Sequence, residues 1–243
     1  MRKGLNDALA VAWLEWLRVR GYFWIFVPIL LLWPLTMLFV MTHVLPPDTT
    51  LTPRLIAGSI VFAVGLNAVN NTGQTLVFWR FSNRLKLLIA SPLHQASFVV
   101  GFLIVPVLHG LFVSSVLLLL APIFDIDVQV NVWFWPVAAL TAFSMVGLAL
   151  LIGTWSPSQA VGNQLSQISG ILVVLVSPIY YPVSRLPDWL EPIARLSPYT
   201  HAANALDSIL SGRNDFYGEL GILAAITAVG LTLGLLGMRW REA

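Results

Sequence analysis

Carboxamide side chains at regular spacing are the groups in this sequence that could do chemistry. Four of them fall at positions 0, 3, 4 and 7 of one apolar stretch, so in a helix they share one face. They are Asn67, Asn70, Asn71 and Gln74. A later apolar stretch opens with Asn163, Ser166, Gln167 and Gly170. Carboxamides exchange hydrogen bonds with polar ligands and are costly in lipid, so both faces should point at protein or water.

Two interpretations of these amide faces follow from the residues. In the first, they line the two walls of an inward-open vestibule in the cytoplasmic half of a bilayer. In the second, they are interhelical hydrogen bonds that hold a bundle together, worth about 0.6 to 2 kcal/mol per contact. The residues alone leave both open.

Other chemistries are excluded by what the chain lacks. It has no cysteine and no Gly-x-x-x-x-Gly-Lys-Ser/Thr phosphate loop, and its four histidines lack the spacing of metal ligands. No nucleophile elbow is present. We therefore expect no catalytic, cofactor-binding or metal-binding residue on this chain, and His109 is expected to be a hydrogen-bonded interior histidine.

The composition shows which elements must position the amides. With 58% hydrophobic and 10% charged residues and a mean hydropathy of +0.83, the chain has too few charges to cover a soluble globule. Six apolar stretches approach the roughly 20 residues needed to cross a bilayer as a helix. They are about 22–45, 55–78, 96–121, 133–155, 162–181 and 216–238. The sequence thus predicts an all-α integral membrane protein, with residues 1–243 as one membrane domain.

The basic residues predict the orientation. Nine of them fall on one side of the six-span plan: Arg2, Lys3, Arg18, Arg20, Arg80, Arg84, Lys86, Arg239 and Arg241. Four fall in the connections on the other side: Arg54, Arg185, Arg195 and Arg213. Because basic residues gather on the cytoplasmic side, both termini are expected to be cytoplasmic.

The first segment, residues 1–21, places Leu5, Leu9, Trp13 and Trp16 at helical spacing, with Glu15 elsewhere around the turn. This pattern predicts an amphipathic helix on the membrane surface, although a plain charged lead-in fits equally. No cleaved signal peptide is expected, because charged residues interrupt the apolar run. Gly230 and Gly234, four apart in the last stretch, predict close helix packing.

Residues 79–95 form the connection between the second and third stretches. Leu85, Leu88 and Ile89 fall on one helical face and Arg84 on another, and Ser91-Pro92 ends the helix. A basic anchor at the cytoplasmic interface would have this pattern. The run Leu87 to Pro92 also resembles the Leu-Leu-x-Ser-Pro signature that follows the coupling helix in permease subunits of type-2 ABC exporters.

A second resemblance to that family lies between Ser177 and Gly212, which includes the segment 182–215. Its marker residues are Pro182, Pro187, Trp189 and Pro198, within the runs Leu186 to Leu190 and Leu196 to His201. Proline-rich, aromatic-rich backbone at a membrane boundary predicts short re-entrant or interfacial helices. The chain departs from the family pattern at Asp207, where a basic residue is frequent.

The resemblance implies a function. The chain would be the transmembrane subunit of an ATP-driven exporter in the cytoplasmic membrane of a prokaryote, surrounded by lipid. It would pair with a second permease chain, as a homodimer or heterodimer, above two copies of an ABC ATPase that bind ATP and magnesium. The second and fifth spans would line the path of an amphiphilic or hydrophobic cargo, such as a drug, antibiotic, lipid or lipid-linked glycan. The face carrying Leu88 and Ile89 would dock on the ATPase.

Two alternatives belong to other classes. An ATP-independent six-span carrier or channel is disfavoured by the few ionisable groups inside the spans, and a membrane scaffold is disfavoured by the coupling-type motif. No nucleic-acid partner is expected.

Overall fold

The computed structural model of the chain describes residues 2–21, 23–43 and 52–237, and every regular element in them is helical. Its α-helices are α1 (Arg2–Arg20), α2 (Phe23–His43), α3 (Thr52–Phe81), α4 (Arg84–Ala90), α5 (Gln95–Leu120), α6 (Phe134–Ser144), α7 (Val146–Trp155), α8 (Gln159–Val176), α9 (Glu191–Leu196), α10 (Pro198–Leu210) and α11 (Tyr217–Gly237). Short 3-10 helices follow α5 and precede α9, at Ala121–Phe124 and Val183–Arg185. The expected all-α class is confirmed for this part of the chain.

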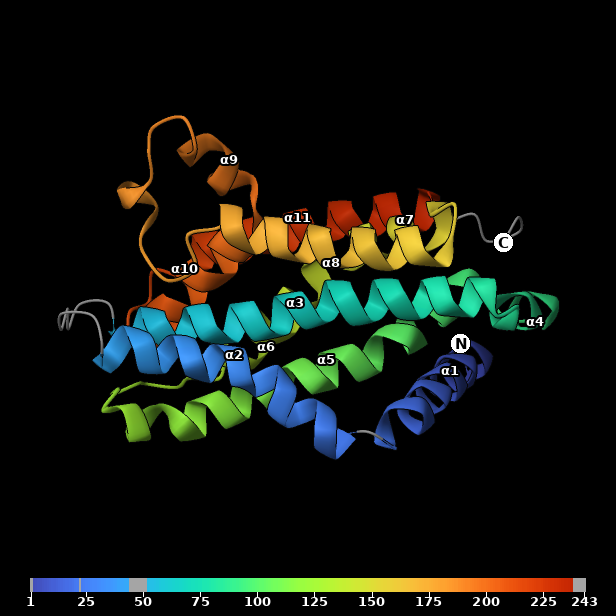
Figure 1. Cartoon of the computed structure of the whole chain (residues 1–243), viewed down its shortest axis with the longest axis horizontal. Helices are drawn as coiled ribbons and strands as arrows, with labels where there is room; N and C mark the ends of the chain where they lie inside the picture. The colour runs from blue at the N-terminus through green and yellow to red at the C-terminus, as the bar shows by residue number, and fades with distance from the viewer. Residues whose placement is uncertain (1, 22, 44–51, 238–243) are drawn as a thin grey trace.

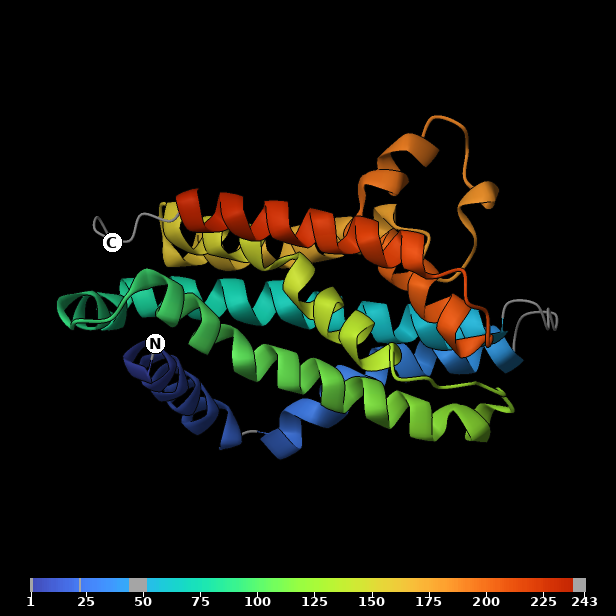
Figure 2. The same cartoon turned by 180° about the vertical axis from the view of Figure 1, so that it is seen from behind.

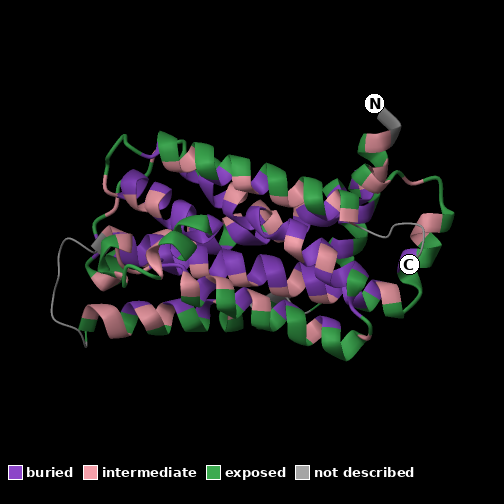
Figure 3. Ribbon diagram, turned by 90° about the horizontal axis from the view of Figure 1, so that it is seen from above, coloured by how far each residue is buried: buried purple, intermediate pink, exposed green. Residues whose placement is uncertain are grey.

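Helix α3 is the centre of the bundle, because α2, α5, α6, α7, α8 and α10 all pack on it (Figure 1). In its most apolar stretch 78% of the residues are buried, against 22% in α8 and 17% in α11. Figure 3 shows the same division, with buried residues along the inner helices and exposed ones on the outer faces. The outer helices therefore offer apolar faces to lipid or to another chain.

Five helical stretches are long and apolar enough to cross a membrane: Pro53–Phe81, Gln95–Phe124, Phe134–Trp155, Gln159–Val176 and Tyr217–Gly237. The first expected span corresponds to α2, whose apolar part, Val27–His43, is shorter. The chain is thus a multi-pass membrane protein, and six spans remain a prediction. The fifth stretch was expected to reach residue 181 but ends at Val176, since Pro178 cannot continue a helix.

The fourth stretch is not one continuous helix. It divides at Met145, whose φ and ψ of −104° and 2° are not helical, into α6 and α7. Close packing of α7 on α11 follows the break. A side chain at Gly147 would collide with the backbone of Gly230, and one at Gly234 would meet the backbone of Gly147. The glycine spacing in the last stretch therefore does permit close packing, with α7 as the partner helix.

The two ends of the bundle carry different elements (Figures 1 and 2). Helix α4, the start of α1 and the end of α11 lie together, and we call this the α4 end. Helices α9 and α10 and the loop before them lie opposite, at the α10 end. The main apolar core packs α3, α6 and α10, and a second cluster around Trp79, Phe98 and Phe102 supports the α4 end.

Candidate functional site

Helix α4 is anchored by the apolar face that was expected to dock on a partner. Leu85 is fully buried against the cluster of Trp79 and Phe98, and Leu88 and Ile89 pack on the same cluster. In this single chain Leu88 and Ile89 are half-buried, and docking of this face on a partner stays a prediction. A seven-residue helix has too few internal hydrogen bonds to be stable alone. Helix α4 is therefore stabilised by packing its apolar face against α3 and α5.

The opposite face of α4 is open and basic. Arg84, Lys86 and Leu87 are exposed, as are Ser91 and Pro92 at its end. A groove of about 290 Å³ runs between α1 and α4 and is lined by Leu14, Arg18, Trp79, Arg84, Leu87 and Leu88. The Arg84 guanidinium lies 5.2 Å from the centre of the Phe78 ring, which holds it beside this groove. The α4 end thus presents a mixed apolar and basic surface.

The four amides of α3 do not act as one face. Asn71 donates a hydrogen bond to Asn67 one turn earlier, and Asn71 lines a small cavity with α1 and α5. Asn70 lies instead against Gly170 of α8, where a side chain would come within 3.1 Å of its Oδ1. Gln74 is half-buried. Neighbouring positions on a helix diverge by about 100°, so a stripe of four residues can serve two sets of neighbours.

Helix α8 packs directly on α3. Ser166 fills the space at Gly73, so closely that a methyl group there would collide with it. Asn163 is half-buried and Gln167 is exposed on the outer side of α8. Within one chain, then, the two amide faces are in contact rather than separated by a vestibule. A water-filled path along them requires a second chain facing α8.

An apolar groove continues this outer face toward the α10 end. It measures about 440 Å³ and is lined by Trp33 of α2, Phe62 and Leu66 of α3, and Ile171, Val174 and Leu175 of α8. The Trp33 and Phe62 rings stack with their centres 5.8 Å apart and form one wall. Polar amides near the α4 end and an apolar groove beyond them together make an amphipathic surface.

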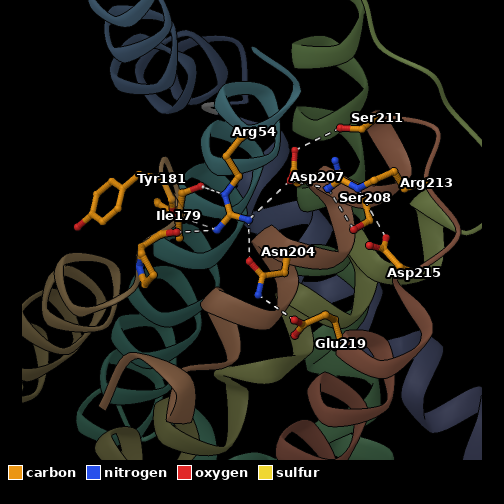
Figure 4. A network of polar contacts seen from close by, with 11 residues as sticks. Arg54, Ile179, Tyr181, Asn204, Asp207, Ser208, Ser211, Arg213, Asp215 and Glu219 are labelled. Carbon is orange, nitrogen blue, oxygen red and sulfur yellow. Dashed lines mark hydrogen bonds and ion pairs between the residues drawn. The ribbon is translucent and has the colours of Figure 1, made fainter. Parts of the chain in front are cut away.

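A buried ionic network closes the α10 end (Figure 4). Arg54 was counted among the residues of an external connection, but it lies in the first turn of α3 and is only 4% exposed. Its guanidinium donates to the carbonyl oxygens of Pro178 at 2.7 Å and Ile179 at 3.0 Å. Asp207 of α10 lies 4.0 Å away and supplies a counter-charge. A buried arginine is tolerated only with such partners.

The network continues from α3 into α10 and α11. Asn204 accepts from Arg54 at 2.6 Å and donates to Glu219 at 2.9 Å, and the second Glu219 oxygen lies 2.5 Å from Nδ1 of His201. The hydrogen bond to the Glu219 carboxylate raises the pKa of His201, although burial opposes it. Arg213 also pairs with Asp207, at 2.9 Å. Spacing of three along 201, 204 and 207 was a signal for a polar helix face that the sequence reasoning missed.

The loop before α10 stands out from the bundle (Figure 1). Its base is closed by a 2.5 Å hydrogen bond between the hydroxyls of Ser177 and Ser197. Pro182 precedes the 3-10 helix at Val183–Arg185, Pro187 is exposed, and Trp189 is 71% exposed at the tip. Pro198 starts α10, which is almost wholly buried. The expected short helices are present, and their relation to a bilayer stays a prediction.

Among the described residues, no group of three or more His, Asp or Glu side chains could hold a metal ion. Nothing in the comparison with curated proteins matches the chain. The family model described as ABC-2 type transporter matches residues 8–211, which covers most of the chain. The chain belongs to the ABC-2 type transporter family. It is therefore the transmembrane subunit of an ABC transporter.

The family match describes the chain as a membrane component and covers most of its helices. The permease is the membrane component, without an ATPase site of its own, and its family normally works with an ATPase subunit. The matched residues end at 211, so they include the part of the α10-end network that lies on α3 and α10 but not Arg213 or Glu219. In this permease α11 carries Glu219, which completes that network, and Gly234, which packs on α7.

Proposed function

We propose that this permease is the transmembrane half of an ATP-driven exporter. In this proposal two copies face one another above two ATPase subunits that bind ATP and magnesium, in the cytoplasmic membrane of a prokaryote. The α4 end, with both chain termini, faces the cytoplasm, because the basic residues gather there. The cargo is amphiphilic or hydrophobic.

The observation that carries the proposal is the amphipathic surface on α2, α3 and α8. It joins the exposed Gln167 to the apolar groove of about 440 Å³ with Phe62 and Ile171 on its walls. A concave, mostly apolar groove with polar groups beside it is typical of a ligand path. With a second copy opposite, the amides contact the polar part of a cargo and the groove contacts its apolar part.

The proposed cycle rests on unequal binding of cargo and nucleotide to two states. Without nucleotide, the space between the copies is open to the cytoplasm and binds cargo. ATP draws the ATPase subunits together, α4 moves with them, and the path closes inward and opens outward. Cargo is released outward because the second state binds it less tightly.

For the movement of the ATPase subunits to reach this chain, α4 must be held rigidly against the rest of the bundle. Leu85 is held in the same cluster as Trp79 near the end of α3 and Phe98 near the start of α5. Arg80 adds a hydrogen bond at 2.8 Å to the Ser156 carbonyl, at the end of α7. A push on the exposed side of α4 is therefore carried into α3, which lies against α8.

The test compares two cysteines, both on exposed outer faces of the single chain, in the complex reconstituted with its ATPase. Gln167→Cys lies on the proposed path and Leu233→Cys lies on α11, which the proposal leaves in lipid. A small water-soluble thiol reagent should modify Gln167→Cys without nucleotide and lose access in a trapped ATP state. Leu233→Cys should react alike in both states. Equal behaviour of the two cysteines would contradict the path.

The energy source is tested separately in sealed vesicles. Transport should require ATP and the ATPase partner, and a proton or sodium gradient alone should drive none. Gradient-driven transport by the permease without any ATPase would favour the alternative of an ATP-independent carrier.

A further inference from the structure

A small polar cavity lies between α1, α3 and α5, beneath the inner face of α1. Its volume is about 10 Å³, close to the roughly 10–15 Å³ that one water molecule needs. Polar residues from all three helices line it: Glu15, Arg18, Asn71, Thr72, Thr75 and His109. The cavity is far too small for a transported molecule, so its occupant has the size of a water molecule.

The carboxyl group of Glu15 is only half satisfied. Its side chain is 2% exposed, and Oε2 accepts from Nε and Nη2 of Arg18 at 3.1 and 2.8 Å. Within the part of the chain that the structure describes, Oε1 has no hydrogen-bond partner, and neither does the buried hydroxyl of Thr72. Buried polar atoms in native proteins nearly always have a partner, often an ordered water. Two such oxygens on one cavity indicate a shared partner.

The packing of α1 explains why a carboxyl group points into the protein. At Gly101 of α5 a side chain would collide with the Ala8 backbone, so the two helices touch. The opposite side of α1 exposes Leu9 and Trp13, at 53% and 58%. The sequence pattern separated Glu15 from the apolar residues of the helix. In the structure the outer side of α1 is apolar, and Glu15 and Arg18 pair on the side that faces the protein. A charged group that faced lipid would lose its hydration, so charged groups in membrane proteins face the protein interior or water.

The charges that face Glu15 come from three helices. Arg18 of α1 and Arg84 of α4 favour the ionised carboxylate, and His109 of α5 lies across the cavity. From α3 the described lining contributes only amide and hydroxyl groups, and from α2 it contributes none. Burial outweighs the two arginines and raises the pKa of Glu15 above its usual value.

We propose that Glu15 is a proton-binding site and that one ordered water joins its Oε1 to the hydroxyl of Thr72. The proton comes from solvent water and adds to the carboxylate oxygen, and no other bond is made or broken. In the protonated form Oε1 donates to the water, while Oε2 keeps its bonds from Arg18. In the ionised form of Glu15, Oε1 accepts a hydrogen bond from the water instead. The contact of α1 with α3 therefore depends on pH, whatever the cargo and whether or not an ATPase is bound.

The test follows the protonated carboxyl group by its infrared C=O band in the purified permease over a range of pH. In wild type the band of a protonated carboxyl group should persist to a higher pH than expected for an exposed glutamate, because burial raises the pKa of Glu15. Glu15→Gln should lack this band, because glutamine keeps the acceptor for Arg18 but cannot ionise. Glu191→Gln is the matched control, since Glu191 pairs with Arg195 in an exposed salt bridge, and it should keep the band. A band that survives in Glu15→Gln, or no such band in wild type, would overturn the proposal.

Two further experiments complete the test. If Glu15→Gln does not fold, the other ten carboxyl residues are replaced one at a time by the matching amide, because the sequence holds 11 Asp and Glu residues in all. Loss of the band in any of those ten chains would overturn the assignment, and retention in all ten supports it. Thr72→Val tests the water link. It should lower the unfolding temperature and shift the titration of the band, whereas an unchanged titration with equal or higher stability would contradict the link.

Discussion

Arg54 and Asn204 are 150 positions apart in the chain, yet Nη1 of the arginine lies 2.6 Å from Oδ1 of the asparagine. This bond joins the first turn of α3 to the middle of α10 (Figure 4). The acidic residue Asp207 has a structural role in the same network. In this chain Asp207 pairs with Arg54 and Arg213, so the negative charge balances a buried arginine.

Replacing Arg54 should weaken the α10 end strongly. Arg54→Ala leaves the carbonyls of Pro178 and Ile179 without their donor and removes one of the two arginines that face the Asp207 carboxylate. Breaking a buried pair from one side costs about 3 to 5 kcal/mol, so the unfolding temperature of the purified permease should fall clearly. Arg195→Ala, which breaks an exposed pair, is the control and should cost less than about 1 kcal/mol. Equal effects of the two substitutions would argue against the network as a stabilising element.

Gly65 should be intolerant of any side chain. In α3 it lies against the ring of Tyr199, which is fully buried, and a methyl group would overlap that ring. Gly65→Ala should therefore cost about 1 to 3 kcal/mol through overpacking. Gly218→Ala in α11 meets no atom within 4 Å and should be neutral or stabilising by up to about 1 kcal/mol. Thermal unfolding of both variants measures the contrast, and a harmless Gly65→Ala would refute the contact.

Substitutions at two leucines of α4 should distinguish an effect on folding from an effect on coupling to the ATPase. Leu85 is fully buried and Leu87 is 74% exposed. Leu85→Asp puts an unpaired charge into the cluster, so the permease should be destabilised by more than about 3 kcal/mol and recovered poorly. Leu87→Asp should leave its stability unchanged but lower ATPase stimulation and transport in the reconstituted complex. Full coupling by the Leu87→Asp chain would show that this face does not meet the ATPase.

The stability of the α10 end should depend on pH through His201. Because its pKa is raised by the Glu219 carboxylate, protonated His201 stabilises the fold. This contribution is complete below the unfolded value of about 6.5 and is lost as pH rises through the higher folded value. Unfolding temperatures of wild type and His201→Gln should therefore differ most at mildly acidic pH and converge at mildly basic pH. His94→Gln, at an exposed site, should follow wild type throughout; a constant gap between wild type and His201→Gln would rule out titration of His201.

The orientation can be read by cysteine labelling, because the chain has no cysteine of its own. Lys86→Cys at α4 should react only from inside the cell, and Asp188→Cys in the loop before α9 only from outside. Both positions are exposed, so access is decided by the membrane. Labelling of both from one side would contradict the proposed topology.

Composition and hydrophobic pattern were sufficient for the membrane class and for most helix positions, and the resemblance of two short runs indicated the family, since each depends on residues close together in the chain. The run Leu87 to Pro92 and the prolines around Trp189 are local signals of that kind. The amphipathic pattern put Glu15 on a different side of its helix from Leu9 and Trp13, but such a pattern tells which residues share a face and not which face meets protein.

The partners of the polar residues were decided by tertiary structure. Whether Leu88 and Ile89 are free or buried depends on Trp79 and Phe98, which pack on α4 only when α3 and α5 lie side by side. Arg54 finds its acceptors in loops and helices more than 120 residues away. A buried charge in a membrane protein is stable only where groups that are distant in sequence come together to hydrogen-bond to it and neutralise it. No local pattern records that arrangement.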